Sequence, residues 1–371
     1  MKILIFNWRD LKHSWAGGGE IYLFEQAKRW VEMEHEVTVF CGQDIEKDLP
    51  SLETIDGIKI YRRGNRYSLY LWAIWYYFRY FRGNADVVVD VVNGIPFFTP
   101  LFCRVPKISY VYHLHGNQFF YELPFPLNHF GFIIERFVLP LLYKYLPMIV
   151  ISETTKKQLI DIGFNKKNIS IVYCGINRLN RTKNSIKKFS APTILYLGRI
   201  KKYKRVDLLV KIFPKIIEKM PLARLIIAGW GTEASNVANL VMKSPLRRKI
   251  ALLGPVSNVE KKSLLSKSWI FVNPSIGEGW SMAVIEANLH GTPTISFDVS
   301  GLRESILSGK TGLLAKNEQD LIDNIYMLLN DNILREKLST NAKKWANTFN
   351  WDHSAKESLH IIEQAKKGKK R

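Results

Sequence analysis

Short runs of apolar, mostly β-branched residues recur every few tens of positions, and a helical pattern follows most of them. Strands this uniformly apolar are buried on both faces, which requires a parallel sheet covered by crossover helices. The pattern breaks at the polar segment 177–190 and then restarts. The runs before the break are Lys2–Phe6, Glu36–Phe40, Gly57–Tyr61, Asp86–Val92, Lys107–Tyr112 and Met148–Ser152, and those after it are Thr193–Gly198, Ala223–Ala228, Ile250–Leu253, Ile270–Val272 and Thr294–Phe297.

The break in the pattern predicts two domains of similar size, because 371 residues exceed one ordinary hydrophobic core. We expect an α/β, doubly wound, Rossmann-like domain over residues 1–176, a linker or hinge over 177–190, and a second such domain over 191–340. The remaining segment, 341–371, ends in a basic tail. Ligands of such folds bind beyond the carboxyl ends of the strands, here in the cleft between the domains.

The net charge of +21 calls for an anionic partner, and most of it, +17, lies beyond residue 180. Nucleic acid, an acidic membrane surface and a phosphorylated small molecule all satisfy this charge. The three cysteines are widely spaced and predict neither a metal site nor a disulfide framework, which fits a reducing, cytoplasmic location. No run reaches the roughly 18 apolar residues of a membrane-spanning helix, so we expect a soluble or peripheral protein.

The segment Asn273–Asn288 carries the most specific chemical pattern. A strand ends there, a loop with glycines at both sides of Glu278 follows, and a helix begins near Ser281. Such a helix start offers free backbone N–H groups and the positive end of a dipole to a diphosphate. Glu278 and Glu286 could hold hydroxyl groups at the two ends of a nucleotide sugar. On spacing alone, a helix-terminal carboxylate and a solvated carboxylate explain them equally well.

This segment resembles the paired-glutamate signature of retaining glycosyltransferases with the GT-B fold, in particular family four, the group 1 transferases. That fold places two Rossmann-like domains face to face across a cleft. The resemblance covers nearly the whole chain and is densest over 193–315. The matching elements, in order, are Leu197–Lys204, Ile227–Gly231, Pro274-Ser275, Glu278-Gly279, Glu286-Ala287, Gly291-Thr292-Pro293, Ser300–Glu304 and Thr311–Leu314.

The resemblance implies a role for each matching residue. Arg199 and Lys204 would bind the donor diphosphate and neutralise the leaving group, where fixed cations lower the barrier. Glu278 would contact the donor sugar, and Glu286 would hold the ribose hydroxyls. It also implies that helices within 341–371 return toward the first domain and that the domains close about the linker. Backbone N–H groups facing the phosphate would come from Gly279, Trp280, Ser281 and Met282.

The turn formed by Gly229, Trp230 and Gly231 has two interpretations. With Ala234 it matches the dinucleotide fingerprint of dehydrogenases. However, it follows a late strand, and no acidic residue ends the next strand. A contact with the nucleotide base is therefore the favoured role.

The first domain offers two further candidate sites. Gly17, Gly18 and Gly19 begin a helix, which suits a close backbone approach to a ligand or a plain tight turn. By the resemblance, this loop faces the donor phosphates. His113 ends a strand, where the family has a histidine near the donor sugar, and its neighbour His115 is the alternative. A purely structural histidine is the other interpretation.

No metal or other cofactor is expected, because the sequence contains no Asp-X-Asp triplet and no cluster with metal-ligand spacing. Arg199, Lys204 and the helix amides would neutralise the diphosphate instead. The resemblance implies attack on the same face as the departing phosphate, through an oxocarbenium-like state. The donor, a nucleotide sugar, is a substrate.

The acceptor is less constrained; we expect a glycan or a lipid-linked acceptor. Tyr67–Arg82 and Phe119–Pro147 are rich in aromatic residues with cations nearby, which suits a peripheral contact with anionic membrane on the cytoplasmic face. Buried crossover helices have a similar composition. The tail 366–371 could add electrostatic attraction, or be simply solvated.

The sequence thus predicts a retaining, metal-independent glycosyltransferase that acts on a nucleotide diphosphate sugar. A non-catalytic nucleotide-sugar-binding protein of the same fold is the first alternative. A basic nucleic-acid-binding protein is the second, although no recognised motif supports it, and no nucleic-acid partner is expected. The base, the sugar, the acceptor and the oligomeric state are not specified by these patterns.

Overall fold

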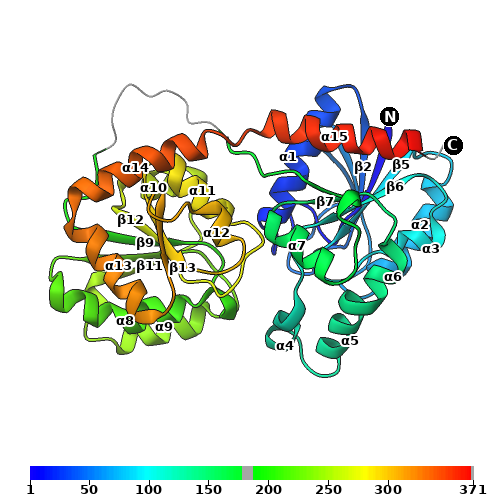
Figure 1. Ribbon diagram of the computed structural model, residues 1–371. Coiled ribbons are helices and arrows are strands. Elements are labelled where there is room, and N and C mark those ends of the chain that lie inside the picture. Colours follow the sequence, from blue (N-terminus) through cyan, green and yellow to red (C-terminus); the bar gives the residue numbers. More distant parts are fainter. Residues whose placement is uncertain (178–186, 369–371) are drawn as a thin grey trace. The chain divides into compact units, whose positions relative to one another are not determined.

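The computed structural model describes residues 1–177 and 187–368 and divides into two compact units. Unit 1 comprises Met1–Gly175 and Asn350–Arg371, and unit 2 comprises Ile176–Phe349. Figure 1 shows that each has a sheet with helices on both faces. The prediction of two Rossmann-like α/β domains is therefore confirmed. Most of the predicted linker, 178–186, lies outside the described residues, as do 369–371 of the basic tail.

Unit 1 is built on an eight-stranded sheet of order β3-β4-β2-β1-β5-β6-β7-β8. All neighbouring strands are parallel except β3 and β4, which form an antiparallel pair at the edge. The two strands of this unit that the sequence did not predict, β3 and β8, are short edge strands without a long continuous apolar run. The strands are β1 Lys2–Phe6, β2 Glu36–Cys41, β3 Leu52–Ile55, β4 Ile58–Arg62, β5 Val87–Val92, β6 Lys107–Val111, β7 Met148–Val150 and β8 Ile169–Ile171.

Two helices of unit 1 continue from an α-helical into a π-helical turn. α2 runs into η1, and α5 runs through η3 into α6. The helices are α1 Gly18–Glu32, α2 Leu69–Tyr76, η1 Tyr77–Phe81, α3 Thr99–Phe102, η2 Gly116–Gln118, α4 Phe119–Glu122, α5 Leu127–Ile133, η3 Ile134–Val138, α6 Leu139–Tyr143, α7 Glu153–Asp161, η4 Lys166–Asn168 and α15 Trp351–Gly368.

The C-terminal helix α15 packs against α1 in unit 1. Trp351 is 2% exposed at its start, and Trp30 of α1 donates its indole N–H to the carbonyl of Ala355 at 3.0 Å. Gly175 has no room for a side chain, since a Cβ atom there would lie 2.3 Å from the backbone nitrogen of Trp351. Trp345, in contrast, donates to the carbonyl of Ser305 and stays in unit 2. The chain therefore re-enters unit 1 at Asn350.

Unit 2 has a six-stranded parallel sheet of order β11-β10-β9-β12-β13-β14. Its strands are β9 Thr193–Leu197, β10 Arg224–Ala228, β11 Ile250–Gly254, β12 Ile270–Asn273, β13 Thr294–Phe297 and β14 Gly312–Ala315. Its helices are η5 Lys202–Lys204, α8 Val206–Lys219, α9 Ala234–Lys243, η6 Arg247–Lys249, α10 Asn258–Lys267, α11 Met282–Leu289, α12 Leu302–Ser305, α13 Glu318–Asn330 and α14 Asn332–Ala346.

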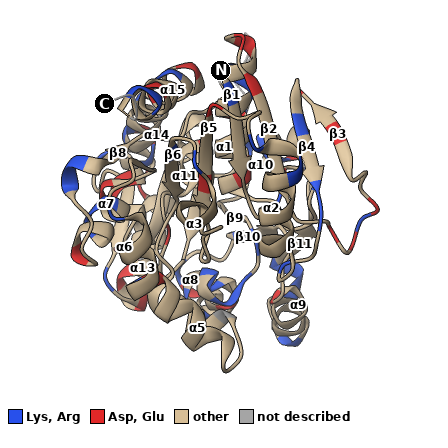
Figure 2. Ribbon diagram, turned by 90° about the vertical axis from the view of Figure 1, so that its right-hand side faces the viewer, with Lys and Arg blue, Asp and Glu red and all other residues tan. Residues whose placement is uncertain are grey.

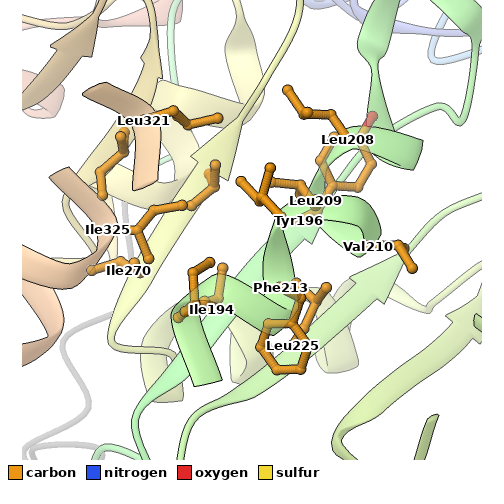
Figure 3. Packing of buried hydrophobic residues seen from close by; sticks show 14 of the residues in the cluster. Ile194, Tyr196, Leu208, Leu209, Val210, Phe213, Leu225, Ile270, Leu321 and Ile325 are labelled. Carbon is orange, nitrogen blue, oxygen red and sulfur yellow. The ribbon is translucent and has the colours of Figure 1, made fainter. Parts of the chain in front are cut away.

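The larger hydrophobic cluster of unit 2 lies between the sheet and the helices α8 and α13 (Figure 3). Ile194 and Leu225 come from the central strands, Phe213 from α8, and Leu321 and Ile325 from α13. All five side chains are at most 1% exposed, so each contributes about 1.5–3 kcal/mol of transfer free energy. This packing holds the carboxyl ends of β9 and β12 in fixed positions, where the candidate residues of unit 2 lie.

Candidate functional site

The unit 2 site lies where the strand order changes direction. From β9 the chain moves outward through β10 to β11, and it then returns to β12 on the other side of β9. A crevice forms beyond the carboxyl ends of two strands at such a switch point, because their following helices diverge to opposite faces of the sheet. Arg199 and Lys204 follow β9, and Glu278 follows β12. The topology therefore brings three predicted residues to the same edge.

Lys204 and Glu278 form an ion pair at this edge, with their side chains 15% and 12% exposed. Burial by itself lowers the pKa of Lys204, but the charge of Glu278, the nearby Tyr203 and the hydrogen bond to Glu278 together raise that pKa above its usual value. The charge of Arg199 also acts on Lys204, in the opposite sense. Lys204 is thus held fully protonated within a group of three charges, where a diphosphate would find a fixed cation.

Glu278 is held by residues of its own loop as well as by Lys204. Its carboxylate accepts a hydrogen bond from the Ser275 hydroxyl at 2.9 Å, and the Asn273 amide lies 3.4 Å away. The backbone is equally constrained, because a Cβ atom at Gly301, which has a φ of +75°, would lie 2.1 Å from the carbonyl oxygen of Glu278. Few positions remain open to this carboxylate, so it is pre-organised.

The loop leads into α11 through Ser281, which has a φ of +90°. Non-glycine residues rarely adopt this conformation, and it often marks a functional site. The Asn273 amide donates to the Ser281 hydroxyl at 3.2 Å and supports the turn. Trp280 is 3% exposed, with its ring 5.2 Å from that of Phe349. At Trp280, only the backbone is therefore available to a ligand.

Glu286 is not joined to Glu278. It lies on α11, where its carboxylate pairs with the ammonium of Lys261 of α10 at 2.7 Å. Both side chains of this second pair are about a quarter exposed, at 26% and 24%. The two glutamates of the sequence signature are thus each neutralised by a different lysine.

The glycines of the 229–231 turn are required by packing. A Cβ atom at Gly229 would lie 1.8 Å from the carbonyl oxygen of Gly198, and one at Gly231 would lie 2.3 Å from that of Ile200. Both glycines have a φ above +140°, which side-chain-bearing residues rarely adopt. The turn is therefore fixed against the loop that carries Arg199, while the Trp230 side chain remains 38% exposed.

In unit 1, the predicted glycine loop and histidine lie beside each other. Gly17 caps α1, and its N–H donates to the carboxylate of Glu20 at 2.7 Å. Gly19 packs on Tyr112, since a Cβ atom there would lie 2.8 Å from the tyrosine ring. His113 directly follows Tyr112 at the end of β6. The missing side chain at Gly19 thus makes room for the ring of Tyr112.

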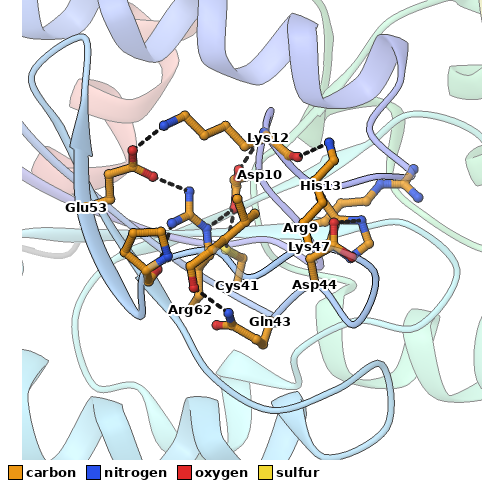
Figure 4. Close-up of polar contacts among 12 residues, drawn as sticks. Arg9, Asp10, Lys12, His13, Cys41, Gln43, Asp44, Lys47, Glu53 and Arg62 are labelled. Carbon is orange, nitrogen blue, oxygen red and sulfur yellow. Dashed lines mark hydrogen bonds and ion pairs between the residues drawn. The ribbon is translucent and has the colours of Figure 1, made fainter. Parts of the chain in front are cut away.

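The segment between β1 and α1 is fixed by a network of charged groups (Figure 4). Asp10 and Arg62 form a fully buried ion pair at 2.6 Å, and Arg62 also pairs with Glu53. Asp44 accepts a hydrogen bond from the backbone N–H of Ser14. Burial lowers the pKa of the adjacent His13, and the Asp44 carboxylate partly opposes this shift. These contacts attach the segment to the strands β3 and β4 and to the loop after β2.

The rings of the two candidate histidines are in contact, with centroids 4.3 Å apart and planes tilted by 35°. The carboxylate of Glu135, on η3, accepts hydrogen bonds from the backbone N–H groups of His115 at 2.7 Å and Gly116 at 2.6 Å. Glu135 is 4% exposed and also lies 3.6 Å from the His115 ring nitrogen. His115 is thus fixed through its backbone, and His113 rests on it at the strand end.

Comparisons with known proteins agree with this architecture. The family model described as Glycosyltransferase Family 4 matches residues 16–178, and the one described as Glycosyl transferases group 1 matches residues 177–345. Together they span both units. The chain belongs to the group 1, family 4 glycosyltransferases. An uncharacterized glycosyltransferase of Methanocaldococcus jannaschii is 26% identical to it, over 98% of each chain.

Solved structures with the same fold resemble this glycosyltransferase over nearly its full length. The sucrose-phosphate synthase of Thermosynechococcus elongatus has a TM-score of 0.81 at 18% identity and covers 98% of each chain. Anabaena HepE, solved in complex with UDP and glucose, has a TM-score of 0.75 at 14% identity, over 98% of this chain and all of the other. At these identities the likeness establishes the GT-B fold.

Sequence reasoning missed the residues that hold the candidate side chains of this glycosyltransferase in place. Asn273 and Ser275 support Glu278, and their position beside it in the loop was an available signal. Lys261, which pairs with Glu286, and Glu135, which anchors His115, come from segments distant in sequence. No local pattern pointed to either. Within 1–177 and 187–368, no three His, Cys, Asp or Glu side chains form a group that could hold a metal ion.

Proposed function

We propose that this glycosyltransferase transfers a hexosyl group, with retention of configuration, from a nucleoside diphosphate sugar to a glycan or lipid-linked acceptor in the cytoplasm. The observation that carries the proposal is the Lys204–Glu278 pair, with Arg199 nearby, at the switch point of unit 2. Membership of the group 1 family and the UDP complex of the similarly folded HepE support this type of donor.

Lys204 and Arg199 would bind the diphosphate as fixed cations. Charge grows on the leaving phosphate as the glycosidic bond breaks, so cations that are already in place stabilise the transition state more than the ground state. Backbone N–H groups at the start of α11, from Gly279 to Met282, would add the positive end of the helix dipole. These groups take the place of a metal ion in the proposed mechanism.

Glu278 would hold hydroxyl groups of the donor sugar, and Glu286 those of the ribose. Both carboxylates are paired with lysines, so a sugar hydroxyl can be accepted without leaving a bare charge in the site. The turn at Gly229 and Gly231 would lie against the base. In unit 1, we assign Gly17, Gly18, Gly19 and His113 to the donor-sugar and acceptor side. Retention would follow from attack on the face that the phosphate leaves.

A thermal shift experiment tests the donor site. The full chain is melted in EDTA with UDP, GDP or ADP, because a ligand at about 100 times its Kd stabilises the folded state by about 2.7 kcal/mol. We expect one nucleotide to raise the melting temperature of the wild type without metal. Lys204→Ala should weaken its binding at least tenfold, or about 1.4 kcal/mol, through loss of the fixed cation.

Two variants serve as controls. Lys211→Ala removes an exposed lysine that pairs only with Asp207, and it should bind nucleotide like the wild type. Lys204→Gln keeps a hydrogen-bond donor for Glu278 and separates the loss of charge from damage to the loop. Binding that survives in both Lys204 variants, or that requires added metal, would refute the proposed site.

A further inference from the structure

Four α-helices of unit 1 contain no charged residue, although they lie on its surface. They are α2, α3, α5 and α6, and the ribbon of this side is shown turned toward the viewer in Figure 2. A surface helix ordinarily has one apolar and one charged face, because its outer face must be solvated. A set of helices that are apolar on both faces indicates that the outer face also meets an apolar environment.

The helix formed by α2 and η1 has a regular outer stripe. Its core side is Leu69, Ala73, Tyr77 and Phe81, all buried. The outward residues recur at steps of three and four and are between 36% and 73% exposed. They are Leu71, Ile74, Trp75 and Phe78.

The continuous helix α5–η3–α6 repeats this arrangement. Its core side includes Leu139 and Tyr143, and its outward residues are between 47% and 82% exposed. They are Phe130, Ile133, Phe137 and Leu141 of the helix and Tyr145, two residues beyond its end. The exposure contradicts the alternative that both aromatic segments are buried crossover helices, since each buries one stripe and exposes another.

The two stripes are parts of one surface, which α3 connects. The ring of Phe102 on α3 lies 5.5 Å from that of Tyr77 on η1, and α3 also contacts α6. Buried Asp90 of β5 accepts hydrogen bonds from Thr99 of α3 and Tyr143 of α6 and so fastens both helices to the sheet. Leu101 of α3 is 68% exposed between the stripes. We call the outward residues of α2–η1, α3 and α5–η3–α6 the apolar face.

Positive charge surrounds the apolar face. Between residues 63 and 85 the chain has four arginines and no acidic residue. All four lie over aromatic rings, among them Arg63 over Trp72 at 4.8 Å and Arg79 over Tyr80 at 5.1 Å. The segment 123–147 has a single acidic residue, Glu135. Glu135 is buried, and its carboxylate accepts hydrogen bonds from two backbone N–H groups. The exposed cations are Arg63, Arg66, Arg79, Arg82, Arg136 and Lys144.

An open groove on α2 combines both features. It has a volume of about 630 Å³ and is lined by Arg63, Ser68, Leu71, Trp72, Trp75, Tyr76 and Tyr80. An arginine beside tryptophan and tyrosine rings suits the boundary between phosphate headgroups and acyl chains. At this boundary the apolar part of each ring contacts acyl chains and its polar group contacts water, while the cation binds the phosphate.

We propose that the apolar face docks this protein on an anionic bilayer, with the outward aromatic and aliphatic side chains in the interfacial layer and the cations on the phosphates. Charge argues against a second copy of the chain as the occupant, because two such faces would bring two sets of cations together. No helix among the described residues is long and apolar enough to cross a membrane. The contact is therefore interfacial, and it does not depend on the proposed donor site.

Flotation of the full chain with vesicles tests the proposal. We expect binding to vesicles of phosphatidylcholine with phosphatidylglycerol, weaker binding to phosphatidylcholine alone, and weaker binding at high salt. The double variant Arg79→Gln, Arg82→Gln should lower the partition coefficient more than tenfold, since each cation contributes about fivefold. Leu71→Ser with Phe137→Ser should lower it at least about tenfold on both vesicle types, because it removes inserted apolar area.

Matched controls come from unit 2. Val259→Ser with Ile333→Ser removes two equally exposed aliphatic side chains, and Arg247→Gln with Arg248→Gln removes two exposed arginines. Both should bind vesicles like the wild type. Melting temperatures and the nucleotide shift should be unchanged in all four variants, which separates this proposal from that of the donor site.

Two results would overturn the proposal. One is equal vesicle binding by the apolar-face and control variants. The other is absence of vesicle binding together with a wild-type dimer that the apolar-face variants convert to monomer, measured by light scattering, because the face would then be an interface between copies.

Discussion

A lysine that stays charged while largely buried needs an ion-pair partner. For Lys204 this partner is Glu278. The carboxylate maintains the charge that a diphosphate requires, yet it also competes with the diphosphate for the same ammonium group. Glu278 is in turn held by Ser275 and Asn273, so it cannot swing away freely. The pair therefore favours a ligand that brings both a negative group for Lys204 and a hydroxyl group for Glu278.

We predict that Glu278→Gln separates binding from turnover. The amide keeps the shape of the side chain but removes the competing charge, so affinity for the nucleoside diphosphate should be retained or raised. Turnover of the nucleotide sugar should fall at least about tenfold, because the sugar contact loses its charged acceptor. Calorimetric titration and a nucleotide-release assay measure the two quantities. Equal losses in both, or none in turnover, would show that Glu278 does not contact the sugar.

At the residue level, the sequence identified side chains whose chemistry is local. Lys204 and Glu278 follow strands at positions that parallel topology brings together, so their proximity could be inferred before any coordinates. The partners Lys261 and Glu135 could not, because pairing across segments depends on helix placement that no local pattern encodes. The sequence pattern favoured a contact with the nucleotide base for the glycines at 229 and 231, but close packing against the backbone already requires glycine at both positions.

The helix α11 joins the loop that carries Glu278 to a half-buried histidine at its other end. His290 caps α11, and its ring nitrogen lies 2.6 Å from the Ser266 hydroxyl. Burial, followed by the charges of nearby Lys262 and Lys261, lowers its pKa to about 4. A folded-state pKa below the usual value means that the fold favours the neutral ring.

The lowered pKa of His290 makes the stability of unit 2 depend on pH. Between the unfolded pKa of about 6.5 and the folded pKa, the unfolded chain binds a proton that the folded chain does not. Stability of unit 2 should therefore fall as the pH decreases through this window. His290→Asn removes the proton site, so urea unfolding of this variant should depend less on pH than that of the wild type. Parallel curves for the two proteins would contradict this role for His290.

Among the elements, strands with a continuous apolar run could be predicted from the sequence, whereas short strands without such a run could not. β5 reads Val-Val-Val-Asp-Val-Val and is buried throughout, so its sequence alone places it at the centre of a sheet. β3 and β8 are short edge strands with little periodicity, and the chain gives no comparable signal. The helix α2 is apolar all round, which left open whether it was buried; only the structure shows its exposed stripe.

For the molecule as a whole, the last helix ties the chain back to its first unit. Trp351 of α15 is 2% exposed and lies against Gly175, the last residue before unit 2. The helix α15 is thus part of the packing of unit 1. The restart of the strand pattern near residue 190 made two units predictable, whereas the crossing point at Asn350 depends on this tertiary contact.

Trp351→Ala should accordingly destabilise unit 1 by about 3–5 kcal/mol, because it leaves a cavity between α15 and α1. Unit 2 should melt as in the wild type and still respond to nucleotide. Calorimetry with and without nucleotide distinguishes the two transitions. Tyr145→Ala, which truncates an aromatic side chain that is 82% exposed, is the control and should leave both transitions in place. A uniform shift of both transitions in Trp351→Ala would argue against separate units.

The most direct test of the proposed transferase is the sugar released when the chain slowly hydrolyses an α-linked nucleoside diphosphate sugar in EDTA, without acceptor. NMR spectra recorded before mutarotation identify the first anomer. We predict that the α-sugar appears first together with nucleoside diphosphate, and that Lys204→Ala lowers the rate at least about tenfold relative to Lys211→Ala. First appearance of the β-sugar, a requirement for metal, or an undiminished rate in Lys204→Ala would contradict the account.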